Sequence, residues 1–338
     1  MLAVVVALSF AACDDDTTVA PPPPPAQLSL TIYNTANGLP NNDVYDIMVD
    51  SQGRTWFATE QGLGVLEGNS IEIINQANGL VHPNTRALLE FGGKIYIGLW
   101  GGGVTIYDDG NWKTLTTERG LISSSVMSIA ADDTSLYFAT PLGVQQYKPS
   151  TDAFVKRFTA LLPRPRWTAT NKRILANVQI SSVVPIDTPR GPEIWMGAIY
   201  GYITIWRPNA DDFITYTPEN SGLPGEMIND MLFNQADGRF WIATSLHGIA
   251  AVDVPNSTWW HFDQLDGLPS SVIQSIAVMQ DGTIWAATNE GIAKQDGNGF
   301  VGYGVASGLP TERVRRVYVD PQDNVWFGFV EGGAAKLN

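Results

Sequence analysis

One short pattern returns along most of the chain and constrains its fold more than any other feature. A Gly-Leu pair recurs at intervals of 41 or 45 residues, with one longer interval of 102 residues, and proline follows it in four of six copies. The copies begin at Gly38, Gly79, Gly120, Gly222, Gly267 and Gly308. Self-similarity of this period is typical of a chain built from repeated supersecondary units, each of which buries its apolar face against the next.

A second pattern recovers the unit that the longer interval hides. An aromatic residue, then an apolar or small residue, then Gly or Ala, recur seven times. The copies begin at Trp56, Tyr96, Tyr137, Trp195, Trp241, Trp285 and Trp326. Seven units at this spacing predict the seven blades of a β-propeller, with the small residue letting neighbouring sheets approach and the ring filling the wider space outside.

Each unit is expected to hold four short strands. In the first unit these are residues 44–50, 55–59, a third strand around Val65 and Leu66, and residues 71–74, with a hairpin turn at DSQGR, residues 50–54. The innermost strands carry apolar residues three apart, and on a regular strand such residues point to opposite faces. We therefore expect both faces of each sheet to be buried, as radially stacked blades require.

The two ends of the repeat region complement each other. The segment LTIYNTANG (30–38) parallels FVGYGVASG (300–308), which is a fourth strand followed by its glycine, while the last unit reaches Asn338 without a fourth strand. The N-terminal strand should therefore complete the seventh blade beside residues 334–337 and remove two exposed edges. The predicted fold is all-β: a seven-bladed propeller of four-stranded antiparallel blades over residues 28–338.

The best-preserved unit resembles a known family. GLPNNDVYDI (38–47) followed by DSQGRTWFAT (50–59) is similar to the two-component regulator propeller repeat, and the resemblance extends over residues 28–338, with the fourth unit matching poorly. In that family such propellers commonly form the extracytoplasmic sensing half of membrane-bound hybrid kinases and read oligosaccharides or other solutes. The resemblance implies the fold and a binding role, and it carries over no catalytic residue.

The N-terminus resembles a bacterial lipoprotein leader. An apolar run over residues 1–12 ends in Ala11-Ala12 and is followed by Cys13, the only cysteine. Twelve residues are too few to span a bilayer but suit the core of a signal peptide. We expect lipidation of Cys13, a proline-rich spacer over residues 13–27, and a protein anchored in the bacterial cell envelope, periplasmic or at the surface, through this lipid alone. The alternative is a chance apolar N-terminus with a free thiol.

Composition removes several classes of function. The formal net charge of -14 argues against a nucleic-acid partner, because phosphate binding needs clustered Lys and Arg. With three histidines and one cysteine, the sequence holds no Cys/His metal spacing, nucleophile elbow or phosphate-binding glycine loop. We therefore predict no metal, no cofactor and no catalytic residue.

Candidate binding residues lie in the turns that join the second and third strands. Together with the segments entering the first strands, these turns form the face on which propellers usually bind. The candidates are Glu60, Trp100, Tyr200, His247, Glu290 and Glu331. The two aromatic rings could stack on sugars and the carboxylates could accept hydroxyl hydrogen bonds. The alternative is that these turns display whatever solubility permits.

The fourth unit has a longer entry segment, residues 159–172, that lacks the Gly-Leu marker. It lies in a basic stretch free of Asp and Glu between Asp152 and Asp187, with Arg164, Arg166 and Trp167 at its centre. A basic, aromatic-bearing insertion on an acidic protein predicts an anionic ligand, either an acidic glycan or the acidic surface of a protein partner. The alternative is a solvated loop.

Three functions remain open at this point. The favoured one is a non-catalytic binding module for a carbohydrate or a protein partner. The second is a propeller-type polysaccharide lyase or glycoside hydrolase that works through His247 with Glu290 or Glu60. The third is a structural scaffold of a cell-envelope assembly.

Overall fold

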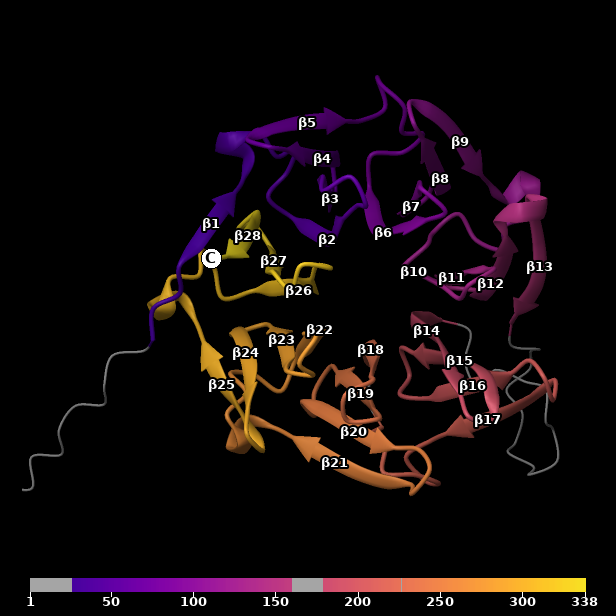
Figure 1. The fold of residues 1–338 in the computed structure, drawn as a ribbon, viewed down its shortest axis with the longest axis vertical. Coiled ribbons are helices and arrows are strands. Elements are labelled where there is room, and N and C mark those ends of the chain that lie inside the picture. Colours follow the sequence, from indigo (N-terminus) through magenta and orange to yellow (C-terminus); the bar gives the residue numbers. More distant parts are fainter. Residues whose placement is uncertain (1–25, 160–178, 226) are drawn as a thin grey trace, which may run out of the picture.

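The computed structural model describes residues 26–159, 179–225 and 227–338. In these residues seven four-stranded antiparallel sheets stand as blades around a central axis (Figure 1). Of five short 3-10 turns in these residues, four lie between blades and one joins two strands of the third blade. The predicted all-β, seven-bladed architecture is confirmed.

The blades follow one another in chain order, and each runs from its innermost to its outermost strand. The first blade holds β2 (Val44–Val49), β3 (Thr55–Thr59), β4 (Gly62–Glu67) and β5 (Ser70–Ile74). The second holds β6 (Thr85–Phe91), β7 (Lys94–Leu99), β8 (Gly103–Asp108) and β9 (Asn111–Leu115). The third holds β10 (Ser128–Ala131), β11 (Leu136–Thr140), β12 (Gly143–Lys148) and β13 (Ala153–Phe158). The fourth holds β14 (Ile180–Thr188), β15 (Gly191–Ala198), β16 (Ile203–Arg207) and β17 (Asp212–Tyr216).

The remaining three blades continue the same order. The fifth holds β18 (Ile228–Asn234), β19 (Arg239–Thr244), β20 (Ile249–Asp253) and β21 (Thr258–Phe262). The sixth holds β22 (Ile273–Val278), β23 (Ile284–Thr288), β24 (Gly291–Asp296) and β25 (Gly299–Tyr303). The seventh holds β26 (Val314–Val319), β27 (Val325–Phe329), β28 (Ala334–Leu337) and, as its outermost strand, β1 (Leu30–Tyr33). The 3-10 turns are η1 (Thr35–Asn37), η2 (Thr117–Arg119), η3 (Pro149–Thr151), η4 (Gln264–Asp266) and η5 (Val305–Ser307).

The N-terminal strand closes the ring. Strand β1 pairs antiparallel with β28, and the register runs from Leu30 opposite Leu337 to Tyr33 opposite Ala334. The ring of Tyr33 lies 5.6 Å from that of Phe57 and 6.0 Å from that of Trp326, measured between centroids. The first and last segments of the propeller thus share one sheet and one apolar contact. This is the closure that the sequence predicts.

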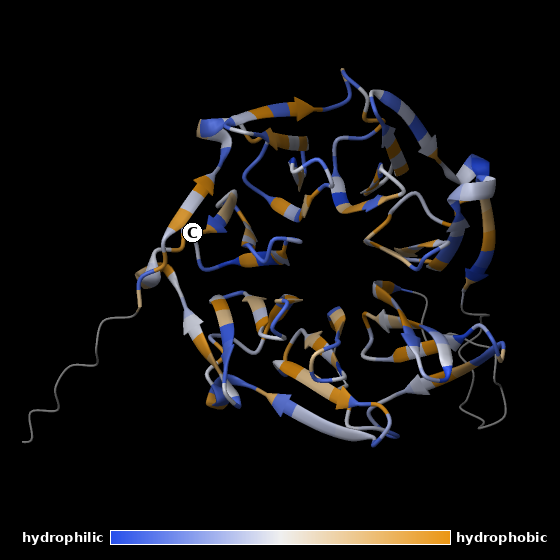
Figure 2. Cartoon of the chain, in the orientation of Figure 1, coloured by the Kyte–Doolittle hydropathy of each residue, from blue (hydrophilic) through white to orange (hydrophobic). Residues whose placement is uncertain are grey.

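The core is divided among the interfaces between blades. Each pair of neighbouring blades encloses a cluster of buried apolar side chains, and Figure 2 shows apolar segments in strands all around the ring. All seven aromatic residues of the repeat are at least 96% buried. The small residue two positions later permits close approach, because a Cβ on Gly197 would lie 2.7 Å from Ile228 of the next blade. Both roles follow the prediction.

One inference about the innermost strands is wrong. Val44 pairs with Thr59 and Ile47 with Phe57, so these two anchors face the same side of the sheet. A β-bulge causes the discrepancy, because the register shifts between Val44 and Asp46 and adds one residue. The three-residue spacing therefore marks a bulge. Both faces of the strand are nevertheless buried, since Asp46 and Met48 cover the other side.

The same bulge recurs around the axis. Register shifts at the second residue occur in β6, β14, β18, β22 and β26 as well as β2. In the third blade, the Met127 amide donates to the Ala139 carbonyl at 2.8 Å, although Ser128 is the residue opposite Ala139. A bulge leaves one residue outside the ladder and redirects its side chain. Each blade thus places one such residue beside the axis.

Candidate functional site

The bulge residues of the innermost strands gather at one mouth of the central channel. We call them the mouth ring, and its members are Tyr45, Arg86, Met127, Ser181, Asn229, Gln274 and Arg315. All seven line a cavity of about 300 Å³. A cavity on the axis of a propeller is a site to which every blade contributes, and its size is at the small end of ligand pockets, which run from about 300 to 1,000 Å³.

Two guanidinium groups of the mouth ring stack on one tyrosine. The Cζ atom of Arg86 lies 3.5 Å from the centroid of the Tyr45 ring, and that of Arg315 lies 4.2 Å from it. Tyr45 belongs to the first blade and the two arginines to its neighbours, the second and the seventh, so the guanidinium groups flank the ring. Cation–π attraction to the ring helps to hold both cations at the mouth.

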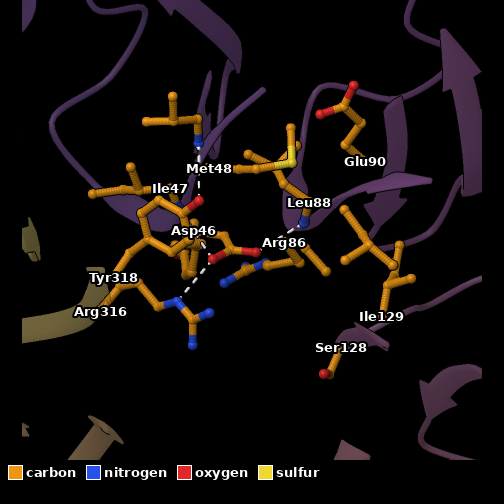
Figure 3. A pocket seen from close by; sticks show the side chains of 14 residues that line it. Asp46, Ile47, Met48, Arg86, Leu88, Glu90, Ser128, Ile129, Arg316 and Tyr318 are labelled. Atoms are coloured by element: carbon orange, nitrogen blue, oxygen red, sulfur yellow. Dashed lines mark hydrogen bonds and ion pairs between the residues drawn. The ribbon is translucent and has the colours of Figure 1, made fainter. Parts of the chain in front are cut away.

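The next residues along the innermost strands form an ion-pair network directly below. Arg316 Nε lies 2.8 Å from Asp46 Oδ1, and Arg316 Nη1 lies 3.2 Å from Asp230 Oδ2. Figure 3 shows Arg316 directed at Asp46, whose other oxygen accepts the Leu88 amide at 2.8 Å. Ser275 donates to Asp230 Oδ2 at 3.0 Å. The network therefore joins the first, second, fifth, sixth and seventh blades.

Burial and charge act in opposite directions on this network. Burial lowers the pKa of the Arg316 guanidinium, but the carboxylates of Asp46 and Asp230 outweigh it and the pKa is raised. Burial also raises the pKa of the Asp46 carboxyl, and Arg316 opposes that shift. Arg316 also lines a second cavity of about 340 Å³ that extends to Glu90 and Tyr318. The network thus lies between the mouth and the deeper part of the channel.

Two of the predicted rim residues lie at the mouth. Trp100 lines the cavity, is 44% exposed, and its ring centroid lies 5.7 Å from the Cζ atom of Arg86. Glu60 lies 3.9 Å from Arg86 Nη2 and accepts a hydrogen bond from Asn84 at 3.4 Å. The sequence therefore located one aromatic wall of the cavity and one carboxylate at its edge.

The other four rim candidates are not part of the cavity lining. Tyr200 is 58% exposed in the β15–β16 turn, and His247 and Glu290 are exposed in the corresponding turns of the fifth and sixth blades. Glu331 is exposed as well, and its amide donates to Asp43 at 3.2 Å.

The geometry gives the acid–base hypothesis no support. Within the described residues the imidazole of His247 makes no hydrogen bond or ion pair, and only its backbone amide is bonded, to Thr244 at 3.1 Å. Glu290 lies on the next blade, whereas Glu60 lies on the first blade, which does not adjoin the fifth. The structure therefore shows no pair of side chains in contact that could act as general acid and base at His247.

The basic candidates of the fourth unit, Arg164, Arg166 and Trp167, lie outside the described residues, as does Cys13. Their predicted roles remain predictions. Among the residues that are described, no group of three or more His, Cys, Asp or Glu side chains is placed to hold a metal ion. None of the helices in these residues is long and apolar enough to cross a bilayer.

Sequence reasoning missed the mouth ring itself. Its signal was present, because the residue after the first apolar anchor of each innermost strand is Tyr, Arg, Met, Ser, Asn, Gln or Arg. A polar residue one place after a buried anchor on a central strand indicates a bulge that turns a side chain toward the axis. The adjacent pair Arg315-Arg316, inside an otherwise apolar strand, was the strongest instance.

Comparison with known proteins supports the predicted resemblance. The model of a family described as two component regulator propeller matches residues 38–61, which confirms the resemblance at the first repeat. No curated protein sequence matches the chain.

Solved structures match over most of the chain. The extracellular domain of BT3049 from B. thetaiotaomicron, named as a hybrid two component system, has a TM-score of 0.77 and 21% identity over 93% of this chain and 41% of its own. The extracellular domain of BT4673 from the same organism, named as a one component system, has a TM-score of 0.72 and 17% identity. The match covers 92% of this chain and 40% of the BT4673 chain. PorZ, a surface component of the type-IX secretion system of Porphyromonas gingivalis, has a TM-score of 0.64 and 14% identity. The match covers 89% of this chain and 47% of the PorZ chain. These likenesses show the propeller fold, and this chain spans less than half of each matched chain.

Proposed function

We propose that this propeller, which carries a two component regulator propeller repeat at residues 38–61, is a non-catalytic binding module that takes a carbohydrate at its channel mouth. The observation that carries the proposal is the composition of the mouth cavity. An exposed indole, Trp100, stands at the edge of a cavity lined by guanidinium, amide and hydroxyl groups. Sugar-binding sites combine an apolar ring that covers one face of a pyranose with polar groups that orient its hydroxyls.

The amides of the mouth ring are oriented for this task. Asn229 Nδ2 donates to the Ile273 carbonyl at 2.6 Å, and Gln274 Nε2 donates to Asn289 Oδ1 at 3.0 Å. Each amide is thus held in place by one hydrogen bond, and its second N–H and its oxygen can still pair with sugar hydroxyl groups. Fixed acceptors of this kind lower the entropic cost of binding.

Binding of the purified protein to a broad glycan array tests the proposal. We expect a restricted set of glycans to bind, and Trp100→Ala to lose about tenfold or more in affinity for them, because one stacked ring contributes on the order of 1.5 kcal/mol. Tyr200→Ala is the matched control, since Tyr200 is an exposed ring on the same face outside the cavity. An array without bound glycans, or equal losses in the two variants, would contradict a carbohydrate site at the mouth.

We also propose that the module works outside the cytoplasm, held by a lipid on Cys13. The apolar run and small pair before Cys13 support this location, and so does the similarity of the fold to extracellular propellers. Metabolic labelling with a fatty-acid probe should mark the wild-type protein and not Cys13→Ser. Equal labelling of the two, or equal partition of both into detergent, would overturn the lipid anchor.

A further inference from the structure

We propose that the mouth cavity binds the carboxylate group of an acidic sugar at the edge of the Tyr45 ring, within reach of both Arg86 and Arg315, with Trp100 against the sugar ring. This rests on the proposed carbohydrate function and adds the chemical class of the ligand. The first observation is the charge of the lining. Three guanidinium groups and one carboxylate line the cavity, and that carboxylate, Asp230, is already bonded to Arg316 and Ser275. Arg86 and Arg315 are thus two lining cations that, among the described residues, have no carboxylate within hydrogen-bond distance, on a protein whose net charge is -14.

The second observation is that Arg315 is incompletely paired. Its Nε atom is buried and, among the described residues, has no hydrogen-bond partner. Its nearest carboxylate is that of Asp43, 3.8 Å from Nη2, too far for a hydrogen bond. A buried donor without a partner is costly, on the order of 1–3 kcal/mol, so such donors in native proteins call for an explanation. A bound anion would accept a hydrogen bond from Arg315 Nε and so explain this donor.

Arg86 shows the same partial pairing on the other side of Tyr45. Its Nε donates to Asn84 at 2.6 Å, whereas Glu60 stands 3.9 Å from its Nη2. Arg54 differs, since its Nε bonds Asp50 at 2.7 Å. The protein thus keeps two like charges close together, and each retains donors for a carboxylate.

The source of the carboxylate follows from the neighbouring groups. Trp100 lies within 5.7 Å of Arg86, so a sugar ring stacked on the indole would bring a ring substituent to the guanidinium groups. The side-chain amides of Asn229 and Gln274 in the lining suit hydroxyl groups. Since an indole beside acceptors and cations matches a uronic acid, the geometry favours a sugar acid over an acidic peptide, whose carboxylates would use the arginines alone.

The test uses short oligosaccharides of galacturonate, glucuronate and alginate, each with a counterpart whose carboxyl groups have been reduced to neutral hydroxymethyl groups. Calorimetry should show that at least one acidic glycan binds, about tenfold or more tighter than its reduced form, and that added salt weakens its binding. Arg86→Gln and Arg315→Gln should lose this preference. Arg313→Gln is the matched control, because it removes the same charge from an exposed side chain outside the lining. Arg315→Lys, which keeps the charge, and a thermal melt of each variant show whether a lost preference comes from unfolding.

The possible results separate the two proposals. A preference for the acid that Arg86→Gln and Arg315→Gln abolish and Arg313→Gln keeps would support the carboxylate site. Equal binding of acidic and reduced glycans, lost in Trp100→Ala, would overturn the carboxylate site and leave the carbohydrate function standing. Failure of every glycan in both forms would overturn both. A polyglutamate peptide bound as tightly by Trp100→Ala as by wild type, with no acidic glycan bound, would assign the arginines to a protein partner instead.

Discussion

Arg316 Nε stands 2.8 Å from Asp46 Oδ1, and this contact joins the innermost strand of the last blade to that of the first. Strand β1 joins the same two ends of the chain at the outer edge, through its pairing with β28. The ring is thus closed twice, once by backbone hydrogen bonds at its perimeter and once by charged side chains at its axis. The two closures differ in kind, because backbone pairing is independent of pH whereas the ion pair depends on the charge of Asp46.

The axial closure can be tested with Arg316→Met, which keeps an unbranched apolar stem and removes the charge. Asp46 and Asp230 would then be buried without a cation, so we expect a loss of about 3 kcal/mol or more in the free energy of unfolding at neutral pH. Burial already raises the pKa of Asp46, and loss of Arg316 should raise it further. Because a protonated carboxyl needs no counter-charge, the loss should shrink as the pH falls. Urea denaturation, monitored by tryptophan fluorescence at several pH values, measures this loss in the free energy of unfolding.

Arg313→Met is the control for that experiment, since Arg313 is exposed near the start of the same strand. We expect it to change the free energy of unfolding by less than about 0.5 kcal/mol. A cost for Arg316→Met that stays the same from neutral to acid pH would contradict a role through Asp46 and Asp230.

Asp152 provides a pH-dependent contact between the second and third blades. It lies 2.6 Å from Lys113 Nζ and 3.0 Å from Arg119 Nη2, and it accepts the Tyr147 hydroxyl at 2.6 Å. The hydrogen bond from Lys113, followed by that from Tyr147, lowers the pKa of Asp152 to about 2. Since an unfolded aspartate titrates near about 3.9, this contact contributes stability above about pH 4 that is lost as the pH falls toward 2.

The predicted effect of Asp152→Asn follows from that window. The side chain is 42% exposed, so the ion pairs are screened and we expect a loss below about 1 kcal/mol at neutral pH. Near pH 2 the wild type and the variant should be equally stable. Asp109→Asn is the matched control, because Asp109 has the same left-handed backbone (φ 45° against 51°) and no ion pair among the described residues. Urea unfolding midpoints measured from neutral pH to about pH 2 test this. If Asp152→Asn and Asp109→Asn changed the midpoint equally, the pH-dependent contribution of Asp152 would be contradicted.

The architecture could be predicted from the sequence because each unit repeats the same local rules. The aromatic residue, the small residue after it and the glycine turn recur, so an error in one unit is corrected by the other six. The last strand was predictable because residues 30–38 match residues 300–308 in pattern. The bulges were not recognised, because a spacing of three residues between anchors has one meaning on a regular strand and another where a residue is added.

The candidate site was harder to predict because its residues come from seven different units. Trp100 was predicted from its position in a turn, whereas Tyr45, Arg86 and Arg315 follow the first anchors of innermost strands, where the sequence analysis expected only packing. Their proximity depends on closure of the whole ring, which no local pattern encodes. The hydrogen bond from Trp326 Nε1 to Asp320 Oδ2, at 3.0 Å, was hidden for a related reason. The Asp320 carboxylate also accepts the Asn324 amide at 2.9 Å, so one side chain serves both the turn and the buried indole.

The perimeter closure yields the last prediction. Deletion of residues 28–37 would remove β1 and leave β28 as an open edge whose amides and carbonyls could pair with another chain. It would also remove Leu28, Leu30 and Ile32, which pack against the apolar cluster of the seventh blade, and uncover Trp326 by removing Tyr33. We expect a large loss of thermal stability and the appearance of oligomers.

Size-exclusion chromatography with light scattering and a thermal melt together measure these effects. Deletion of residues 14–25 is the control, because the sequence predicts a proline-rich spacer there, and its melting temperature should match that of the full chain. A synthetic peptide of residues 26–38 should return the protein lacking residues 28–37 to the monomer, because it fills the vacant position beside β28. If both deletions melted alike, or if the peptide had no effect, β1 would not hold the ring closed. The axial ion pair between Arg316 and Asp46 would then be the more important closure, and Arg316→Met should be the variant that opens the propeller.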